Sequence, residues 1–522
     1  MPLDKSIENK EGIMTIKKVV IVGGGTAGWL AANHLGKKLH NNSKVSVALI
    51  ESPDIPPIGV GEGTVPNIRK TLASFGISET EFFRRCEATF KQSIKFINWM
   101  DKDNSTKENY FHHLFDVPSK YGEDLTTHWL NNGQEQHYAD YVSAQHSACE
   151  QSKAPKLITT PEYHGDLGYA YHLNAAKFAE LLAENATEKY GVEHLKANVN
   201  QVKTNVDGEI ASLVTDAHGE LAYDFYIDCT GFESLLIDKA LNVPFVDKSK
   251  ELLVNTALVV QVPTKETDEI PPYTLATAHQ AGWIWDIALT NRRGVGFVYS
   301  NNHMSDEEAS AKLDNYLKGN PDGLTYRKLP MKVGHREKFW HKNCVVLGLA
   351  QGFLEPLEAS SILLTDFAAG FLADRFPESK ADMSGLEKRF NHVMGYAWDR
   401  VVDFVKLHYC ISDRTDSQFW LDNKKTDTIP DTLKERLALW QQYVPQKEDF
   451  FSKFEVFDYD NYLYLLYGMN FGTKLEIKGG AYQNQAESHA QQISQVTKQL
   501  NEALPSHREL INKIKQYGMQ SL

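Results

Sequence analysis

The sequence has few cysteines, and they are not arranged for a disulfide framework or a metal site. The five cysteines of the 522-residue chain are widely separated, without a C-x-x-C pair or a cysteine–histidine ligand spacing. Neither a disulfide-stapled secreted domain nor a zinc domain is therefore indicated, and no metal site is predicted. This cysteine usage is typical of the reducing cytoplasm, so we expect a cytoplasmic location.

Long hydrophobic runs and an excess of positive charge are also missing. No apolar stretch approaches the roughly 20 residues that span a bilayer, and Met1 to Lys10 is polar rather than similar to an export signal. The formal net charge is -13, so nucleic acid and anionic membranes would be repelled over most of the surface. We therefore expect neither nucleic acid nor a membrane as a partner.

A glycine-rich turn near the N-terminus predicts a dinucleotide site. Residues 17–22 are a β-branched run, Gly23, Gly25 and Gly28 have the spacing G-x-G-x-x-G, and residues 29–39 have helical spacing. In a strand–turn–helix unit, such glycines allow a tight turn and close approach of the backbone to a pyrophosphate at the helix N-terminus.

A carboxylate stands where the second half of a dinucleotide site needs one. The strand predicted for residues 45–50 is followed by Glu51, roughly 20 residues after the turn, where an acidic side chain accepts hydrogen bonds from ribose hydroxyls. This pairing favours cofactor binding over a merely glycine-rich turn, although NAD and FAD share the fingerprint.

Two later segments favour FAD. Residues 224–232 (D-F-Y-I-D-C-T-G-F) resemble the strand and D-x-T-G turn of flavin monooxygenases, and residues 345–353 (V-V-L-G-L-A-Q-G-F) again look like a buried strand before a small-residue turn. An ordinary buried strand with a turn is the alternative for each. The residues predicted to contact FAD are Gly23, Gly25, Thr26, Ala27, Gly28, Glu51, Val199, Leu347 and Gly348.

These patterns predict an α/β protein with a Rossmann-like FAD-binding fold of the flavin monooxygenase type. Residues 1–15 are polar without periodicity and predict a flexible N-terminal extension. Residues 16–375 should form the FAD-binding core, including a tryptophan strip at 282–287 and an insertion at 104–160 that lines a substrate pocket. Residues 376–522 should form a mainly helical part that packs over the core and the pocket.

Apolar residues at three- and four-residue steps predict one long helix over residues 79–100. Lys91 and Lys95 would then lie one turn apart on the same face. Further helices are predicted at 174–190, 435–442, 461–466 and 491–516, and strands at 225–228, 252–263 and 295–299.

Four segments resemble motifs of flavin-dependent halogenases of the tryptophan or indole halogenase group. They are G-V-G-E-G-T-V-P at 59–66, F-K-Q-S-I-K-F at 90–96, G-W-I-W-D-I at 282–287 and F-L-E-P-L-E at 353–358. In the family, the first is a loop over the flavin and the third is the hallmark of the group.

The resemblance implies a role for each matched residue. Lys91 stands at the family's catalytic lysine, which hydrogen-bonds hypohalous acid or takes up the halogen. Glu358 stands at the active-site glutamate, which stabilises the positively charged arenium intermediate and removes its proton. Trp283 and Trp285 would fill the space between the flavin and the substrate, so that only a small neutral oxidant passes.

Ordinary structural roles are the alternatives for these residues. Paired aromatic side chains most often pack in a core, and a lysine on an apolar helix most often extends its ammonium to solvent. A glutamate at a helix start interacts favourably with the helix dipole. The functional interpretation requires Lys91 and Glu358 to line one cavity.

The substrate side carries a weaker match. Residues 110–115 (Y-F-H-H-L-F) resemble the family's Y-H-P-F segment, which places His113 and Phe115 beside the aromatic substrate, although leucine replaces the proline. No segment matches the tyrosine-rich clamp for the amino-acid group of tryptophan, so an indole-like or other electron-rich aromatic is predicted rather than free tryptophan specifically.

Two departures from the family motifs concern the tryptophan strip and the halide. Ala288 replaces the proline that usually follows the strip, which should loosen the turn there. Ser360 and Ser361 stand where the family holds halide and flavin with Thr-Gly or Thr-Ser. Both chloride and bromide therefore stay candidates.

The resemblance implies a halogenase that uses FADH2, O2 and halide to form hypohalous acid. No second dinucleotide fingerprint is visible in the sequence, so a separate NAD(P)H-dependent flavin reductase should supply FADH2 by diffusion. A homodimer is the default oligomeric state. The alternatives are a flavin-dependent aromatic monooxygenase (hydroxylase) and a catalytically silent FAD-binding protein.

Overall fold

The computed structural model describes residues 14–40, 44–55, 61–101, 108–120, 122, 125–320, 323–474 and 480–521. Residues 1–13 of the predicted N-terminal extension lie outside these ranges, as do residues 59 and 60 of the halogenase-like segment at 59–66. Thr15 forms an isolated β-bridge with Ser379.

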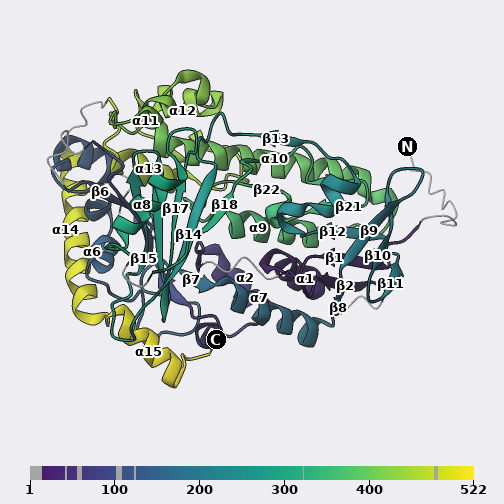
Figure 1. The fold of residues 1–522 in the computed structure, drawn as a ribbon. Coiled ribbons are helices and arrows are strands. Elements are labelled where there is room, and N and C mark those ends of the chain that lie inside the picture. The colour runs from purple at the N-terminus through teal and green to yellow at the C-terminus, as the bar shows by residue number, and fades with distance from the viewer. Residues whose placement is uncertain are drawn as a thin grey trace, which may run out of the picture.

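A six-stranded sheet forms one end of the molecule (Figure 1). All neighbouring strands in it are parallel except the edge pair β20–β21. Its inner strands are almost entirely buried β-branched and aliphatic residues, as expected for a parallel sheet covered on both faces. The strands, in spatial order, are β20 (Trp340–His341), β21 (Cys344–Val346), β12 (Phe225–Asp228), β1 (Lys18–Val22), β2 (Ser46–Glu51) and β8 (Glu193–Lys196).

Helices α1 (Thr26–Leu39), α7 (Ala175–Glu184) and α9 (Ser360–Asp374) pack together beside this sheet (Figure 1). Asn174 caps α7 by accepting hydrogen bonds from the N–H groups of Ala176 and Lys177. The helix predicted at 174–190 is therefore confirmed, and its last turn, Asn185–Lys189, is π-helical. The predicted strand–turn–helix unit is confirmed by β1 and α1.

A seven-stranded sheet forms the other large layer, and most of its neighbouring strands are antiparallel (Figure 1). Trp283 pairs with Val298 and Trp285 with Gly296, so both indoles lie on one face of the sheet. The strands, in spatial order, are β18 (Arg327–Pro330), β14 (Thr256–Pro263), β17 (Arg292–Tyr299), β16 (Gly282–Ala288), β15 (Tyr273–His279), β5 (Ser93–Ile97) and β6 (Tyr110–Leu114).

The long helix predicted over residues 79–100 is wrong. Helix α3 (Glu79–Arg85) ends after two turns, and Glu87 has a left-handed φ of 53° that turns the chain into β4 (Thr89–Lys91). Strand β4 pairs with β7 (Ala170–Asn174), which also pairs with β3 (Gly61–Gly63). Lys91 and Lys95 therefore lie on two different strands, in two different sheets.

Ala288 does not loosen the turn after the tryptophan strip. It stays in the β16–β17 ladder opposite Arg293, and the Leu289 N–H donates to the Arg292 carbonyl at 2.8 Å.

The C-terminal part is mostly helical, as predicted, but residues 491–516 form two helices. Pro505 interrupts the predicted helix, and the Ser506 hydroxyl caps the second piece by accepting from the Glu509 N–H. The six helices are α10 (Lys380–Cys410), α11 (Gln418–Asn423), α12 (Asp431–Trp440), α13 (Tyr459–Gly468), α14 (Gly480–Ala503) and α15 (His507–Tyr517). No helix within the described ranges is long and apolar enough to cross a bilayer.

The insertion at 104–160 is more ordered than a loop, because it holds β6 and three short helices. Helix α14 runs along them at the outer edge of the molecule (Figure 1). The remaining elements are α2 (Asn67–Phe75), α4 (Leu125–His128), α5 (Tyr138–Val142), α6 (Gln145–Glu150), α8 (Asp306–Tyr316), β9 (Val199–Thr204), β10 (Ile210–Thr215), β11 (Gly219–Leu221), β13 (Phe245–Asp247), β19 (Gly334–Arg336) and β22 (Gly352–Phe353).

Candidate active site

The glycines of the N-terminal turn differ in what surrounds them. A Cβ on Gly23, whose φ is 118°, would lie 2.2 Å from the Cys229 carbonyl oxygen, and one on Gly28 would lie 1.9 Å from the Gly23 carbonyl oxygen. These two positions accept only glycine because of close backbone packing. A Cβ on Gly25 would meet nothing within 4 Å in the described structure, so this glycine faces open space.

The N-terminus of α1 is built to receive an anion. Gly25 is its N-cap, without a side-chain hydrogen bond, and its first turn holds no acidic residue, so the N–H groups of Thr26 and Ala27 are not capped by a carboxylate. The segment Leu347-Gly348 lies beside it, because a Cβ on Gly348 would be 2.5 Å from the Cβ of Ala27. The two segments predicted to contact FAD thus meet at one point.

Glu51 lies against the same turn. A Cβ on Gly24 would be 2.6 Å from the Glu51 Oε1, while Oε2 is 2.7 Å from the His194 Nε2. Val199 begins β9 shortly after β8, which pairs with the strand that ends in Glu51. The turn, the open helix end and the carboxylate fit a bound dinucleotide such as FAD.

The D-x-T-G segment has a structural role. One Asp228 carboxylate oxygen accepts from the N–H and hydroxyl of Thr230, and the other accepts from the N–H groups of Leu236 and Ile237. Both oxygens are therefore used to hold the turn. The Asp228 carbonyl accepts from the Leu347 N–H at 2.9 Å, which aligns the two predicted flavin segments.

A pocket of about 240 Å³ lies between the β6 end of the seven-stranded sheet and α13. Among its lining residues are Glu358 and the two side chains predicted to border the substrate, His113 and Phe115. Because His112 and His113 are consecutive residues of strand β6, they point to opposite faces of the sheet, and His113 is the one that lines the pocket. The full lining is Val65, Pro66, Asn67, His113, Leu114, Phe115, Asp116, Val117, Glu358, Leu363, Val456, Phe457, Asp458, Asp460, Asn461 and Tyr464.

Glu358 is buried between two histidines. Its carboxylate oxygens lie 2.9 and 3.0 Å from the His113 Nδ1, and Oε1 lies 2.9 Å from the His408 Nε2. Burial alone would raise the pKa of Glu358, but the two imidazoles outweigh burial and lower the pKa to about 2. The two imidazoles therefore favour the ionised form of the carboxylate.

The tautomer of His113 follows from its other neighbour. The Asn461 side-chain oxygen accepts from the Asp458 N–H at 3.0 Å, so the Asn461 amide nitrogen is the group that donates to the His113 Nε2 at 3.1 Å. Nε2 is then an acceptor, and the His113 proton is on Nδ1, from which it is donated to Glu358.

His408 has an acceptor at each ring nitrogen. Its Nδ1 is 2.9 Å from the Phe404 carbonyl oxygen, and its Nε2 is 2.9 Å from Glu358. The two contacts are both satisfied by an imidazolium beside the ionised carboxylate, or by a neutral ring beside a protonated carboxyl. One proton can therefore be shared between Glu358 and His408.

Lys91 is buried behind Phe115. Its side chain is 1% exposed, and its Nζ donates to the Thr64 carbonyl at 3.1 Å and lies 5.2 Å from the centre of the Phe115 ring. Burial lowers the pKa of the Lys91 ammonium to about 8, and the charge of Glu358 opposes the shift. Lys91 itself is not among the residues that line the pocket, but Phe115 and the residue after Thr64 are.

Strand β3 passes close to the Lys91 ammonium at Gly63. A Cβ on Gly63 would lie 3.4 Å from Nζ, 3.5 Å from the His172 ring and 3.6 Å from the Thr274 hydroxyl. These three groups therefore converge on one glycine. Thr64, whose carbonyl accepts from Lys91, is itself fixed by two hydrogen bonds to the backbone of Tyr171.

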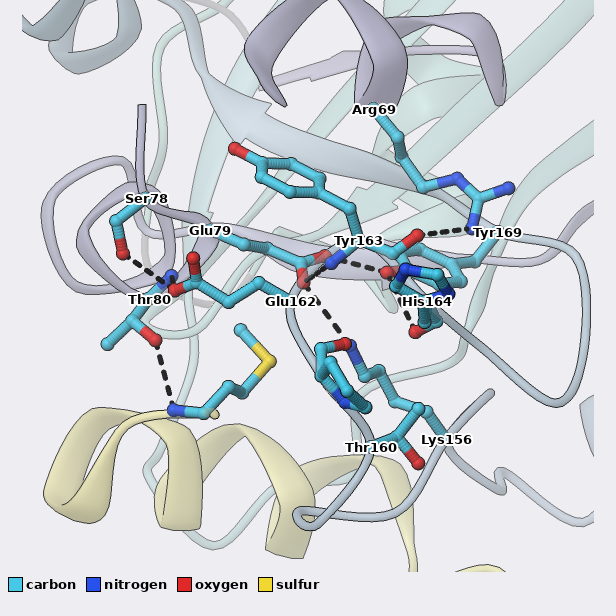
Figure 2. Close-up of polar contacts among 12 residues, drawn as sticks. Arg69, Ser78, Glu79, Thr80, Lys156, Thr160, Glu162, Tyr163, His164 and Tyr169 are labelled. Carbon is cyan, nitrogen blue, oxygen red and sulfur yellow. Dashed lines mark hydrogen bonds and ion pairs between the residues drawn. The ribbon is translucent and has the colours of Figure 1, made fainter. Parts of the chain in front are cut away.

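A buried polar network centred on Glu79 supports the strand that pairs with β4 (Figure 2). One Glu79 oxygen accepts from the hydroxyls of Tyr169 and Tyr171, and the other accepts from the Tyr163 N–H and the Lys156 ammonium. Glu79 and Lys156 are fully buried, and each is partnered, so the network stabilises a defined conformation.

The same network ties the C-terminus to α3 (Figure 2). The Glu162 carboxylate accepts from the Ser78 hydroxyl and the Thr80 N–H, and the Thr80 hydroxyl accepts from the Met519 N–H. These residues lie behind β7, away from the pocket-lining set, so we assign them to support rather than chemistry.

The two tryptophans of the strip are buried and adjacent. Trp283 and Trp285 are 1% and 7% exposed, with ring centres 6.2 Å apart. The Trp283 indole N–H donates to Glu355 at 2.6 Å. Trp285 lies over Gly296 on the neighbouring strand, where a Cβ would be only 2.1 Å from the Trp285 Cζ2.

Gly296→Ala should displace the Trp285 ring. We expect overpacking to lower the free energy of unfolding by about 1 to 3 kcal/mol and to raise the fraction of oxidant that escapes instead of reaching an aromatic substrate. Thermal unfolding and trapping of free oxidant measure the two effects. Gly385→Ala is the control, because a Cβ there meets nothing within 4 Å; equal behaviour of both variants would contradict the role assigned to Trp285.

Helix α9 begins immediately after Glu358. Its N-cap, Ala359, has a left-handed φ of 54° and makes no side-chain cap, so the N–H groups of Ser360 and Ser361 start the helix. The N-terminus of a helix as long as α9 favours a small anion, because the first N–H groups have no partner within the helix. The position fits the predicted halide contacts, which stay a prediction.

Several site residues were missed or left open by the sequence. Asn461 and Thr64 carried no predicted role, and the sequence His-Tyr-Cys at His408 to Cys410 resembles the family but is equally compatible with a supporting structural role. The D-x-x-N pattern at 458–461 is readable as a helix cap, but its contact with His113 joins residues 348 positions apart. Only the fold brings these groups together.

Known proteins resemble the chain over nearly its whole length. The sequence profile described as Tryptophan halogenase matches residues 18–479. The chain is 35% identical over 474 residues to tryptophan 6-halogenase SttH of Streptomyces toxytricini, an alignment that covers 86% of this chain and 89% of that protein.

Two solved structures share the fold. A tryptophan halogenase from Shewanella frigidimarina NCIMB 400 is 40% identical with a TM-score of 0.94, covering 98% of this chain and 100% of that one. Tar14, a tryptophan C-6 flavin-dependent halogenase (chlorinase) from taromycin biosynthesis, is 32% identical with a TM-score of 0.88, covering 96% and 100%. The predicted fold class is confirmed, and the chain belongs to the tryptophan halogenase family of flavin-dependent halogenases.

Proposed function

We propose that this flavin-dependent halogenase uses FADH2, O2 and chloride or bromide to form hypohalous acid, and transfers the halogen to an indole-like or other electron-rich aromatic. One observation carries the proposal: Glu358 is held ionised by two imidazoles at an aromatic-lined pocket. The tryptophan strip and the pair of Lys91 and Glu358 oppose a hydroxylating monooxygenase, and a silent flavoprotein has no need of the pocket.

The cofactor end fits FAD through the glycine turn, the open end of α1 and Glu51. When bound there in reduced form, FAD supplies the activation of O2 that converts halide to hypohalous acid. The start of α9 at Ser360 and Ser361 holds the halide by its free N–H groups. Trp283 and Trp285 separate this chamber from the pocket and exclude an aromatic substrate from the flavin.

Lys91 orients the oxidant from behind Phe115, a residue that lines the pocket. Its ammonium is fixed by the Thr64 carbonyl, and its remaining N–H groups donate to hypohalous acid, which makes the halogen more electrophilic. Since burial lowers its pKa to about 8, a neutral amine that takes up the halogen is also accessible near that pH.

Glu358 acts on the substrate ring. Its negative charge stabilises the arenium cation, and the carboxylate then accepts the ring proton. Because His408 can share that proton, the carboxylate returns to its ionised form without direct access to solvent. His113 keeps the carboxylate oriented by donating from Nδ1.

The substrate class rests on the pocket and on the relatives. SttH and Tar14 are described as tryptophan 6-halogenases, and a volume of about 240 Å³ lies at the small end of ligand pockets. An indole-like aromatic fits both. Among the described residues that line the pocket there is one tyrosine, Tyr464, and its hydroxyl already donates to the Asp116 carbonyl.

Turnover of indole with bromide tests the proposal. The purified protein would be supplied with FADH2 by an unrelated NADH-dependent reductase, and the products would be identified by mass spectrometry. Brominated indole is expected; hydroxylated indole would identify a monooxygenase, and unchanged indole across a panel of electron-rich aromatics a silent flavoprotein. Omitting the reductase should stop the reaction, because the proposal includes a separate reductase; rapid NADH oxidation by the protein alone would contradict that part.

A further inference from the structure

Glu355 is a second buried glutamate beside the active site. It precedes Glu358 by three residues and is 1% exposed. Its Oε2 accepts from the Trp283 indole N–H at 2.6 Å and from the Tyr409 hydroxyl at 2.5 Å, whereas Oε1 has no hydrogen-bond partner within the described part of the chain. The mechanism above does not use this side chain.

A carboxylate in this place is costly to the fold. An unpartnered buried oxygen loses its hydration without compensation, and an apolar side chain of similar volume would avoid that loss. Burial raises the pKa of Glu355 to about 7, against the hydrogen bonds from Tyr409 and Trp283. Because Oε2 accepts from both Trp283 and Tyr409, the Glu355 side chain joins an indole of the strip to helix α10.

The two glutamates of the F-x-E-P-L-E segment are held in parallel by consecutive residues of α10. His408 contacts Glu358, and Tyr409 contacts Glu355. On the opposite side, His113 of β6 contacts Glu358, and Trp283 of β16 contacts Glu355. One helix therefore fixes both the carboxylate that faces the substrate and an indole of the strip.

The α10 end of this link is rigid. The Tyr409 ring is 1% exposed and lies 5.3 Å from the Trp99 ring and 5.8 Å from the Trp420 ring, centre to centre. The indole N–H groups of Trp99 and Trp420 are bonded to the Ala276 and His279 carbonyls. A hydroxyl anchored in this way can fix the Glu355 carboxylate, which in turn fixes the Trp283 ring plane.

We propose that Glu355 is a positioning residue that clamps the Trp283 indole and so keeps the passage between the flavin chamber and the substrate pocket narrow. It acts through Trp283 and does not touch the substrate. The proposal rests on the proposed function, because a passage for hypohalous acid matters only in a halogenase. Without the clamp, the indole can tilt, and oxidant leaves for solvent before it reaches the aromatic substrate.

Partition of the oxidant tests the proposal. Holoenzyme would be supplied with FADH2, bromide, indole and a phenol attached to a soluble polymer, which is too large for the pocket and is brominated only by escaped hypobromous acid. Glu355→Leu should raise the ratio of brominated polymer to brominated indole at least about tenfold, since a misplacement of about 1 Å can cost up to two orders of magnitude. FAD affinity and O2 consumption should be unchanged.

Two further variants separate positioning from general loss of structure. Trp283→Phe keeps a ring but removes the N–H, so it should raise the ratio as Glu355→Leu does, and the double variant should add nothing more. Glu355→Gln keeps an acceptor oxygen and should restore the ratio of the unmodified enzyme. Trp340→Phe is the matched control, because its buried indole donates to the Lys342 carbonyl far from the strip.

The outcomes are distinguishable. An unchanged ratio in Trp283→Phe, or a Glu355→Gln variant as leaky as Glu355→Leu, would overturn the clamp while leaving halogenation intact. If Glu355→Leu does not fold, Trp283→Phe and Glu355→Gln still decide. Failure of the unmodified enzyme to brominate any aromatic would instead overturn the proposed function.

Discussion

Lys91→Met should abolish halogen transfer while making the protein more stable. The substitution keeps the length of the side chain but removes the ammonium that is proposed to hydrogen-bond the oxidant. Loss of a positioned proton donor or base costs about 10²- to 10⁴-fold in rate. Because the buried ammonium is replaced by an apolar group, the free energy of unfolding should rise, by about 3 kcal/mol for a pKa lowered from 10.5 to about 8.

The sign of the stability change depends on pH. A lowered lysine pKa means that the folded state disfavours the charged form, so the penalty is fully present below about pH 8 and disappears as the pH rises toward 10.5. The stability gained by Lys91→Met should therefore be largest at neutral pH and fade above pH 10. Urea unfolding of both proteins across this range measures it.

Three measurements complete the test of Lys91. FAD affinity and oxidant production should be unchanged in Lys91→Met. Lys95→Met should transfer halogen normally, because Lys95 lies on a different strand from Lys91 and pairs with Glu150 of helix α6. Parallel loss of FAD binding and activity would make Lys91 structural. In the unmodified enzyme, single-turnover transfer that falls above about pH 8 identifies the ammonium as the active form, and transfer that rises identifies the amine.

Local patterns predicted the cofactor end of the molecule well. The predicted first two strands and the strand at 225–228 are short apolar runs bounded by turn residues. Each lies in the buried parallel sheet, and the glycine turn follows the first strand, as predicted. The reason is physical, since strands covered on both faces need continuous apolar sequence, and a tight turn needs glycine.

The long helix over residues 79–100 could not be rejected from the sequence. Phe90 and Ile94 satisfy a helical pattern, but Phe90, Ile94 and Phe96 also satisfy the two-residue alternation of strands. Their strand partners are Tyr171 on β7 for Phe90, and Thr274 and Ala276 on β15 for the other two. Pairing over such sequence distances overrides local spacing. It places Lys91 on a strand rather than on the face of a helix.

The contacts that orient the site residues were beyond sequence reasoning for a similar reason. The resemblance named Glu358 and the tryptophans, but the hydrogen bonds of Glu358 to His113 and His408, and of Trp283 to Glu355, join four separate elements. No periodicity encodes such contacts. The paired use of His408 and Tyr409 became visible only once α10 was placed beside the F-x-E-P-L-E segment.

Glu358→Gln should lower halogen transfer by about 10²- to 10⁴-fold while hypohalous acid is produced at the normal rate. The amide removes the negative charge that faces the arenium cation and cannot accept the ring proton. Burst measurements with preformed FADH2 give the rate of transfer, and trapping by an external bromine acceptor gives the output of oxidant. Glu150→Gln is the control, because Glu150 also accepts from a buried histidine but lies outside the pocket.

The same substitution reports on the two histidines. His113 donates from Nδ1, and His408 has acceptors at both nitrogens, so the carboxylate now receives N–H groups from both rings. An amide has one acceptor oxygen, and its NH2 would face one of these donors. We therefore expect Glu358→Gln to lose the hydrogen bond to one of the two imidazoles, which NMR of labelled histidine can measure. An oxidant output that falls together with transfer would contradict the assignment, because it would place Glu358 on the flavin side of the tryptophans.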